Sequence, residues 1–197
     1  MDLTDLHSDP LVQFRRWFQA ARAEGIELPE AMTLATATPD GRPSARTVLL
    51  KGVDKRGFLF FTNYESRKGL ELAANPHAAL VFHWPQAPRR QVTAAGAVER
   101  LPAAESEEYF GTRPLGSRLG AWASRQSEPL PGREALEAAL AAAEERYGDE
   151  PPLPPWWGGY VLRPERVELW ENRPNRLHDR FRYTRRGDAW DLERLAP

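Results

Sequence analysis

Residues 32–63 read MTLATATPDGRPSARTVLLKGVDKRGFLFFTN, and this stretch decides the fold class. It holds three runs rich in Thr, Val, Leu and Phe, which are residue types that favour strands. Two polar segments separate the runs, PDG at 39–41 and DKRG at 54–57, and their Pro, Asp and Gly residues are typical of tight turns. Because short turns join antiparallel neighbours, the stretch predicts an antiparallel meander of three strands at about 32–38, 42–53 and 58–63.

The rest of the chain adds helices and more strands. Apolar residues at helical spacing predict an N-terminal helix over about 10–25, with Asp9 as its N-cap and Pro10 at its first position. Further helices are expected at about 66–72, 103–110, 116–124 and 133–147, and further strands at about 78–84, 91–101, 159–170, 179–185 and 188–193. About eight strands joined mostly by short turns predict a mainly antiparallel, closed β-barrel with flanking helices, in a single domain over 1–197.

Composition narrows the class of protein. With 197 residues, 41% of them hydrophobic, the chain can bury a substantial core. The absence of Cys excludes disulfides and thiolate sites, and four scattered His residues predict no metal site. A net charge of −1 argues against a nucleic-acid-binding surface. No long apolar run and no signal-like N-terminus occur, so we expect a cytoplasmic protein with no membrane partner.

Two groups of basic residues could bind anions. Arg46 and Lys51 are five apart in a predicted strand, so they would point to opposite faces and reach one phosphate only if the backbone bends. Arg67 and Lys68 follow Ser66 at the predicted start of a helix, where free N–H groups favour phosphate. The alternative for both groups is that they are ordinary solvated side chains at the ends of elements.

A third group consists of Tyr109, Arg113 and Ser117, spaced by four. On a continuous helix these side chains would share one face and offer a phenol, a guanidinium and a hydroxyl to a phosphate. Pro114 and Gly116 interrupt the helical pattern, so the shared face depends on how the chain continues past them. A solvated polar face is the alternative.

A fourth group is Arg176, His178 and Arg180, which alternate and would share one face of a strand. A neutral imidazole between cations suits recognition of a ring or proton transfer, whereas a surface histidine is the simpler alternative. Seven Trp residues could stack on a flat ring, although most are expected in the core. The four groups together could bind two phosphorylated ring molecules, one of them a cofactor.

Five stretches, taken in order, are specific for one family. They are 43–51 (PSARTVLLK), 61–69 (FTNYESRKG), 120–127 (GAWASRQS), 157–159 (WGG) and 176–180 (RLHDR). Through them the chain resembles, from residue 9 to residue 197, the pyridoxamine (pyridoxine) 5′-phosphate oxidases, which are FMN enzymes of vitamin B6 metabolism.

The resemblance implies a split β-barrel that works as a homodimer, with FMN at the subunit interface and the strands at about 159–197 serving dimerisation and the substrate. It also implies which residues contact FMN. They are Arg46, Thr47, Val48, Leu49, Leu50, Lys51, Phe61, Thr62, Arg67, Lys68, Gln91, Gln126, Ser127, Trp170 and Arg180.

For the substrate, the resemblance implies a phosphate held by Lys51, Tyr109, Arg113 and Ser117. Arg176, Leu177 and His178 would hold the pyridine ring, with Arg176 and His178 as the catalytic residues. The implied reaction is hydride transfer from the 4′ carbon of pyridoxamine or pyridoxine 5′-phosphate to FMN. Oxygen would then be the acceptor, and the products would be pyridoxal 5′-phosphate and hydrogen peroxide.

Two other functions are compatible with the same residues. A relative on the same barrel could oxidise another ring, such as a phenazine precursor, but it would not need the complete set of phosphate donors. A non-enzymatic barrel could bind single-stranded nucleic acid through basic and aromatic faces, although the net charge of −1 argues against this.

Overall fold

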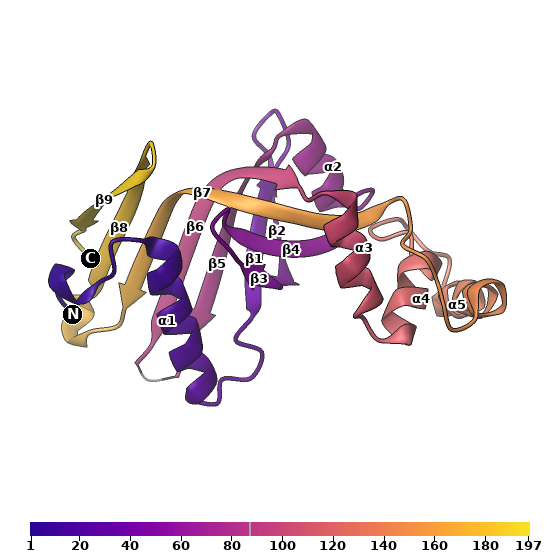
Figure 1. Cartoon of the computed structure of the whole chain (residues 1–197), viewed down its shortest axis with the longest axis horizontal. Coiled ribbons are helices and arrows are strands. Elements are labelled where there is room, and N and C mark those ends of the chain that lie inside the picture. Colours follow the sequence, from indigo (N-terminus) through magenta and orange to yellow (C-terminus); the bar gives the residue numbers. More distant parts are fainter. Residues whose placement is uncertain (87) are drawn as a thin grey trace.

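The computed structural model describes residues 1–86 and 88–197. Within these residues, nine strands form one antiparallel sheet, in which the main path runs β2-β1-β5-β6-β7-β4-β3 while β8 pairs with β7 and β9 (Figure 1). The strands are β1 (Ala31–Ala37), β2 (Pro43–Leu49), β3 (Gly52–Val53), β4 (Phe58–Asn63), β5 (His77–Trp84), β6 (Arg90–Arg100), β7 (Trp157–Glu171), β8 (Asp179–Arg186) and β9 (Ala189–Arg194).

Five α-helices flank this sheet. They are α1 (Pro10–Ala23), α2 (Arg67–Ala74), α3 (Ala103–Gly111), α4 (Leu115–Ala123) and α5 (Arg133–Tyr147). Two short 3₁₀ turns lie at Leu3–Asp5 and Pro174–Arg176. The predicted helices and most of the predicted strands are confirmed, with ends that differ by one or two residues. None of the helices in the described part of the chain is long and apolar enough to cross a membrane.

The predicted strand over 42–53 is interrupted in the middle. The Leu50 N–H donates to the Glu30 carbonyl at 2.9 Å, and the Lys51 N–H donates to the Leu59 carbonyl at 2.8 Å. The chain therefore changes partners within two residues, from β1 to β4, while Leu50 turns into the core. The predicted three-stranded meander is therefore wrong, because this stretch forms two separate hairpins, β1–β2 and β3–β4.

The sheet curls but does not close. Among the described residues, β2 is paired only with β1 and β3 only with β4. Although only Leu50 and Lys51 separate β2 from β3, no hydrogen-bonded ladder closes the path, so the predicted closed barrel is wrong. The long strand β7 has different neighbours along its length, with β4 beside its first part and β8 beside its last. The result is a split β-barrel with flanking helices, as the family resemblance implied.

A bulge in β7 adds to this curl, because Glu165 is the extra residue opposite the step from Ala95 to Gly96 of β6. Gly96 is required there because a Cβ would lie 2.0 Å from the Arg163 carbonyl oxygen of the neighbouring strand. The bulge thus lets β7 bend without losing β6 as its partner.

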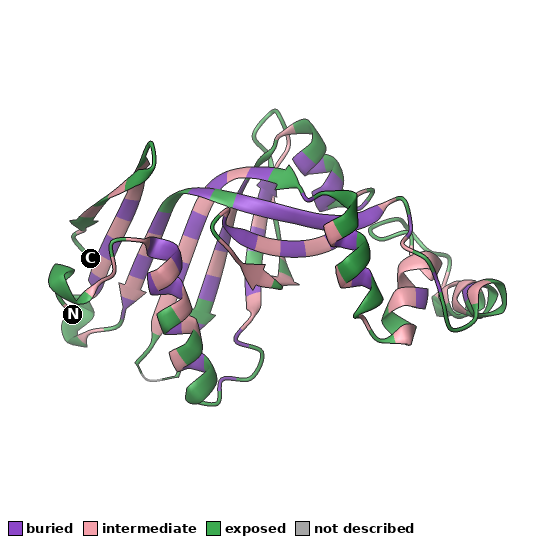
Figure 2. Cartoon of the chain, viewed as in Figure 1, coloured by how far each residue is buried: buried purple, intermediate pink, exposed green. Residues whose placement is uncertain are grey.

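Helix α1 covers one face of the sheet and builds the core. Asp9 caps it as predicted, because its Oδ1 accepts the Leu11 N–H at 2.7 Å. Phe14 is fully buried, with its ring centroid 4.9 Å from that of Phe58 and 4.8 Å from that of Phe82. Burial of such a ring contributes about 2 kcal/mol. Figure 2 shows buried residues alternating along the strands beneath α1.

Helices α3, α4 and α5 lie at the opposite end of the molecule from the two termini (Figure 1). The predicted interruption at Pro114 is confirmed, since α3 ends at Gly111 and α4 begins at Leu115. The chain turns between them, and residues of this turn line a cavity together with residues of β2 and β4.

Candidate functional site

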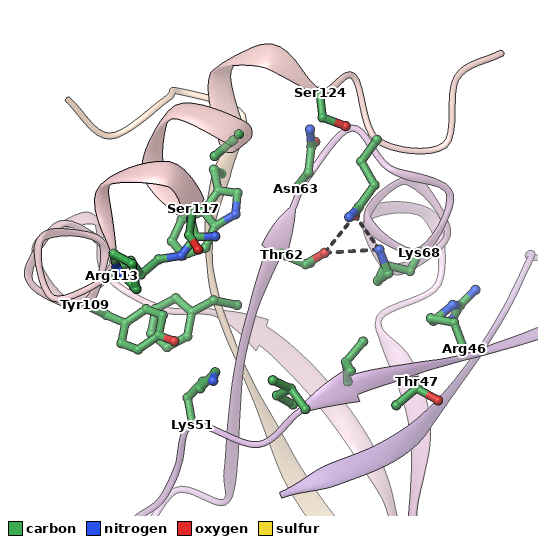
Figure 3. A pocket seen from close by; sticks show the side chains of 18 of the residues that line it. Arg46, Thr47, Lys51, Thr62, Asn63, Lys68, Tyr109, Arg113, Ser117 and Ser124 are labelled. Carbon is green, nitrogen blue, oxygen red and sulfur yellow. Dashed lines mark hydrogen bonds between the residues drawn. The ribbon is translucent and has the colours of Figure 1, made fainter. Parts of the chain in front are cut away.

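A cavity of about 740 Å³ lies between the sheet and helices α3 and α4. Figure 3 shows Arg46 and Thr47 on one side, Tyr109, Arg113 and Ser117 on the other, and Thr62 between them. Many of the residues predicted from the sequence line it together. They are Arg46, Thr47, Val48, Leu49, Lys51, Phe61, Thr62, Lys68, Tyr109, Arg113, Ser117 and Gln126.

At the strand end of the cavity, oxygen atoms hold Arg46. Its Nη1 donates to Thr36 Oγ1 at 2.6 Å and to the Leu34 carbonyl at 3.1 Å, while its Nη2 donates to Ser44 and lies 3.4 Å from Glu71 Oε2. All of these partners come from β1, β2 and α2. The guanidinium is thus fixed by the folded sheet before any ligand arrives.

Glu71 is the buried acceptor at the centre of this network. It accepts from Thr36, from Ser44 Oγ at 2.5 Å and from Arg67 Nε at 2.9 Å. Burial by itself raises the pKa of a carboxyl group, but the hydrogen bonds from Ser44, Thr36 and Arg67 outweigh it and lower the pKa of Glu71 to about 2. The carboxylate is therefore ionised at neutral pH.

Lys68 lies beside this network at the start of α2. Ser66 is the N-cap of the helix, as predicted, and its Oγ accepts from the Gly69 N–H. The Lys68 Nζ is buried and lies 2.6 Å from Gln126 Oε1, 3.1 Å from Thr62 Oγ1 and 3.1 Å from Ser66 Oγ. Burial and the nearby charge of Arg46 lower the pKa of Lys68 to about 8. Its partners are all neutral, so its charge remains available to an anion.

At the helix end of the cavity, aromatic rings hold Arg113. Its Cζ lies 4.5 Å from the centroid of the Trp157 ring and 5.5 Å from that of Phe110. Its Nη1 is buried without a hydrogen-bond partner, and burial lowers the pKa of the guanidinium. Tyr109 and Ser117 line the same end, although they come from two helices that Pro114 separates. The continuous helix that a shared face required does not form, but the turn at Pro114 still brings Tyr109, Arg113 and Ser117 into the lining of one cavity.

Lys51 lines the cavity together with Arg46, although alternation along a strand predicted opposite faces. The sequence allowed both side chains to reach one site only if the backbone bends, and this condition is met, because β2 ends at Leu49 and the chain bends before Lys51. Lys51 is exposed, and Figure 3 shows it below Tyr109, between the two ends of the cavity.

Sequence reasoning did not assign Asn63, Thr112, Ser124 or Trp157 to the site, yet all four line the cavity. The Gly158-Gly159 pair after Trp157 was a usable signal, because repeated glycine indicates close packing. A Cβ on Gly158 would lie 2.1 Å from the Tyr64 hydroxyl, and one on Gly159 would lie 2.7 Å from the Phe61 ring.

Several predicted contacts do not line this cavity. Leu50 is buried in the core, Arg67 is exposed and paired with Glu71, and Ser127 follows Gln126 in a left-handed conformation with φ of 78°. Gln91, Trp170 and Arg180 form a separate row across the sheet, because Gln91 pairs with Trp170 and Trp170 pairs with Arg180 in the strand register. Paired residues point to the same face, so these three side chains lie together.

Arg176, His178 and Arg180 were predicted to share a strand, but only Arg180 lies on one. β8 begins at Asp179, and the 3₁₀ turn before it places Asn175 at φ of 57° and Arg176 at φ of 62°. Positive φ is costly for such residues and occurs often at functional sites. Leu177 is exposed in this turn, and the His178 ring lies 4.6 Å from that of Trp170. His178 therefore adjoins the sheet row, and neither His178 nor the exposed Arg176 lines the cavity.

Comparison with known proteins places both regions in one family. The sequence profile described as "Pyridoxamine 5'-phosphate oxidase" matches residues 18–147, and that described as "Pyridoxine 5'-phosphate oxidase C-terminal dimerisation region" matches residues 157–197. The chain is 60% identical to "Pyridoxine/pyridoxamine 5'-phosphate oxidase 1" of Ralstonia nicotianae, over 100% of this chain and 93% of that protein. It is 56% identical to "Pyridoxine/pyridoxamine 5'-phosphate oxidase" of Burkholderia lata, with the same coverage.

Solved structures share the fold. PhzG from Burkholderia lata 383, in complex with tetrahydrophenazine-1-carboxylic acid, aligns with a TM-score of 0.93 and 35% identity over 98% of this chain and 95% of that chain. A pyridoxamine 5'-phosphate oxidase-related, FMN binding protein from Nostoc punctiforme aligns with a TM-score of 0.75 and 22% identity over 93% and 97% of the two chains.

Proposed function

Because the chain belongs to the pyridoxamine 5'-phosphate oxidase family of FMN-dependent oxidoreductases, we propose that it oxidises pyridoxamine and pyridoxine 5′-phosphate to pyridoxal 5′-phosphate. Dioxygen is the proposed acceptor and becomes hydrogen peroxide. Pyridoxine phosphate needs no other reactant, whereas pyridoxamine phosphate also consumes water and releases ammonia. This reaction would place the protein in vitamin B6 biosynthesis and salvage.

One observation supports this proposal most strongly. The cavity has cationic donors at two opposite ends, and those at the helix end, Arg113 above all, lack a carboxylate partner in the described part of the chain. A cofactor with one phosphate and a substrate with another would together use both ends. A substrate without a phosphate would leave Arg113 buried and unpaired, at a cost in free energy.

The donors at the strand end suit the phosphate and ribityl chain of FMN. Arg46 and Lys68 supply two positive charges, while Thr62 and Gln126 supply neutral polar groups beside them. Thr47, Val48, Leu49 and Phe61 would contact the ring system, since they line the same cavity. When bound, FMN supplies the hydride acceptor for the 4′ carbon of the substrate.

The residues at the helix end would bind the substrate phosphate. Arg113 and Lys51 would carry the positive charge, while the Tyr109 and Ser117 hydroxyls would donate hydrogen bonds. Holding the phosphate there fixes the pyridine ring in one orientation and removes the entropic cost of finding it during the reaction.

Most of the remaining predicted residues would come from the partner subunit of a homodimer. The matching dimerisation profile over residues 157–197 supports a homodimer, and this segment carries Trp170, Arg176, His178 and Arg180. We propose that the row of Gln91, Trp170 and Arg180, with Leu177, completes the site at the subunit interface. Ser127 and Arg67, the sequence neighbours of Gln126 and Lys68, would lie at the edge of the same subunit's FMN site. Arg176 would assist proton removal from the 4′ amine or alcohol, and His178 would position the ring.

A second candidate is oxidation of a phenazine-type ring, which the likeness to PhzG supports. Both candidates require FMN, so the substrate phosphate separates them. Pyridoxamine 5′-phosphate and unphosphorylated pyridoxamine are the matched pair of probes.

The test is an anaerobic absorption spectrum of the FMN-loaded protein. Pyridoxamine 5′-phosphate should bleach the flavin bands at concentrations at least 100-fold below those that pyridoxamine requires, because a charge-assisted phosphate site contributes about 3 kcal/mol. Equal bleaching by the two compounds would favour the second candidate. A protein that binds no FMN would overturn both.

A further inference from the structure

Arg113 differs from the other cations of the cavity in what holds it. Among the described residues, no acidic side chain lies within ion-pair distance of its guanidinium, and no hydrogen bond from the guanidinium is found. Its guanidinium is nevertheless half-buried, so the usual compensation for removing a charge from water is missing. An arginine in this position needs another partner to keep its orientation.

That partner is the face of Trp157. The guanidinium carbon lies 4.5 Å from the centroid of the indole, within the range of a cation–π contact. The indole is itself fixed, being only 8% exposed and parallel to two neighbouring rings. The plane of the indole makes an angle of 16° with the Phe61 ring and 7° with the Tyr109 ring, at centroid distances of 5.7 and 6.2 Å.

We propose that Trp157 is the positioning residue for the substrate phosphate, acting through Arg113. A carboxylate would hold the guanidinium equally well, but it would also cancel the charge that a phosphate needs. An aromatic face orients the guanidinium and leaves its net charge and its N–H groups free. This inference rests on the proposed function, since it assumes that a phosphorylated substrate binds at Arg113.

The packing also links Arg113 to the rest of the phosphate site. Tyr109, which lines the same end of the cavity, stacks on Phe61 at 4.0 Å, and Phe61 stacks in turn against Trp157. Trp157 therefore supports both phosphate donors. Its ring face contacts Arg113, and it stacks on Phe61, against which Tyr109 also stacks. Loss of the indole should loosen the phosphate site while leaving the strand end, with Arg46 and Lys68, in place.

The test is a double-mutant cycle on the FMN-loaded enzyme, using Trp157→Leu, Arg113→Ala and the double variant. Steady-state kinetics with pyridoxamine 5′-phosphate would give KM and kcat, and inorganic phosphate would serve as a competitive inhibitor. Trp157→Leu should raise both KM and the phosphate inhibition constant about 10-fold, with a smaller change in kcat. Trp157→Phe, which keeps a ring face, should recover most of this loss.

In the Arg113→Ala background, Trp157→Leu should have a much smaller effect, because its main partner is gone and only the stack with Phe61 and Tyr109 remains. Additive effects, or a Phe variant no better than Leu, would overturn the inference. Trp156→Leu is the matched control, since that indole packs on Trp122, not on Arg113, and should leave the phosphate inhibition constant unchanged. A wild-type enzyme that does not oxidise pyridoxamine 5′-phosphate would instead refute the proposed function, independently of the cycle.

Discussion

The two ends of the cavity hold their arginines by different means. At the strand end, Arg46 is surrounded by hydroxyls, a carbonyl and the buried carboxylate of Glu71. At the helix end, Arg113 lies against Trp157, with one nitrogen unpartnered. The hydrogen bonds at the strand end fix the orientation of the Arg46 guanidinium firmly, but Glu71 offsets part of its charge. The aromatic contact at the helix end leaves the charge of Arg113 intact but holds its guanidinium less firmly.

This difference matches the two ligands that we propose. A cofactor that stays bound benefits from a fully formed, rigid set of donors. A substrate that must enter and leave benefits from a strong charge held with fewer fixed hydrogen bonds. The comparison can be tested by removing each support in turn.

The largest effect is expected at the strand end, for Glu71→Ala. The change leaves Arg46, Ser44 and Thr36 without their common acceptor, so the free energy of unfolding should fall by about 3 kcal/mol. The pKa of Glu71 is lowered from 4.5 to about 2, so its contribution is present above pH 4.5 and lost as the pH falls towards 2. The variant should therefore lose less stability than wild type over that interval.

Denaturant unfolding at pH 7 and at pH 3 would measure both effects. Glu65→Ala is a matched control, because Glu65 is exposed and precedes the same helix. Equal losses for the two variants would mean that Glu71 does not organise the strand end.

The next largest effect is expected at the helix end, for Arg113→Ala. Losing a charge-assisted contact with the substrate phosphate should raise KM for pyridoxamine 5′-phosphate about 100-fold, while the FMN dissociation constant changes little. Kinetics and an FMN titration on the same preparation would separate the two. The exposed Arg125→Ala is the control, and a parallel rise in both constants would show that the two ends are not distinct.

A smaller effect concerns pH and Lys68. Its pKa of about 8 means that, in the FMN-free protein, the ammonium loses its proton above pH 8. FMN should then bind more weakly, with the dissociation constant rising by up to about 10-fold per pH unit. Fluorescence titrations at pH 7, 8 and 9 would measure this rise. Lys68→Met should remove the pH dependence, and Lys55→Met, at an exposed position, should keep it.

The smallest effect is expected for Arg67→Ala. Its side chain is 64% exposed and pairs with Glu71 at 2.9 Å, outside the cavity. An exposed ion pair contributes about 0.5 kcal/mol, so the FMN dissociation constant should change about twofold, as expected for a residue at the edge of the proposed FMN site. A change above 10-fold would place Arg67 in direct contact with the cofactor phosphate.

The sequence predicted the local elements well and their assembly less well. Asp9 and Ser66 were identifiable as helix caps because a cap depends on neighbouring residues only. The break at Leu50 was not predictable, because it arises from pairing with both Glu30 and Leu59, which are remote in the sequence. For the same reason the strand count was low by one and the open edge of the sheet was missed.

In the candidate site, too, residues close together in the sequence were predicted and those brought together by the fold were not. Tyr109, Arg113 and Ser117 were found from their spacing, and the cavity brings them together. Trp157 was not assigned, because one Trp among seven carries no signal of its own and its role depends on Arg113 lying over it. His178 and Arg176 were misplaced on a strand because nothing in their alternation indicates the left-handed turn at Asn175.

The strand β7 has a consequence for how the sequence can vary. It carries Trp157 at one end and Trp170 at the other, and at about 3.3 Å per residue these positions are separated by roughly 40 Å at most. An insertion or deletion of one residue between the bulge at Glu165 and Trp170 would reverse the side-chain alternation and turn Trp170 away from Gln91 and Arg180. We therefore expect this segment to tolerate substitutions far more readily than changes of length.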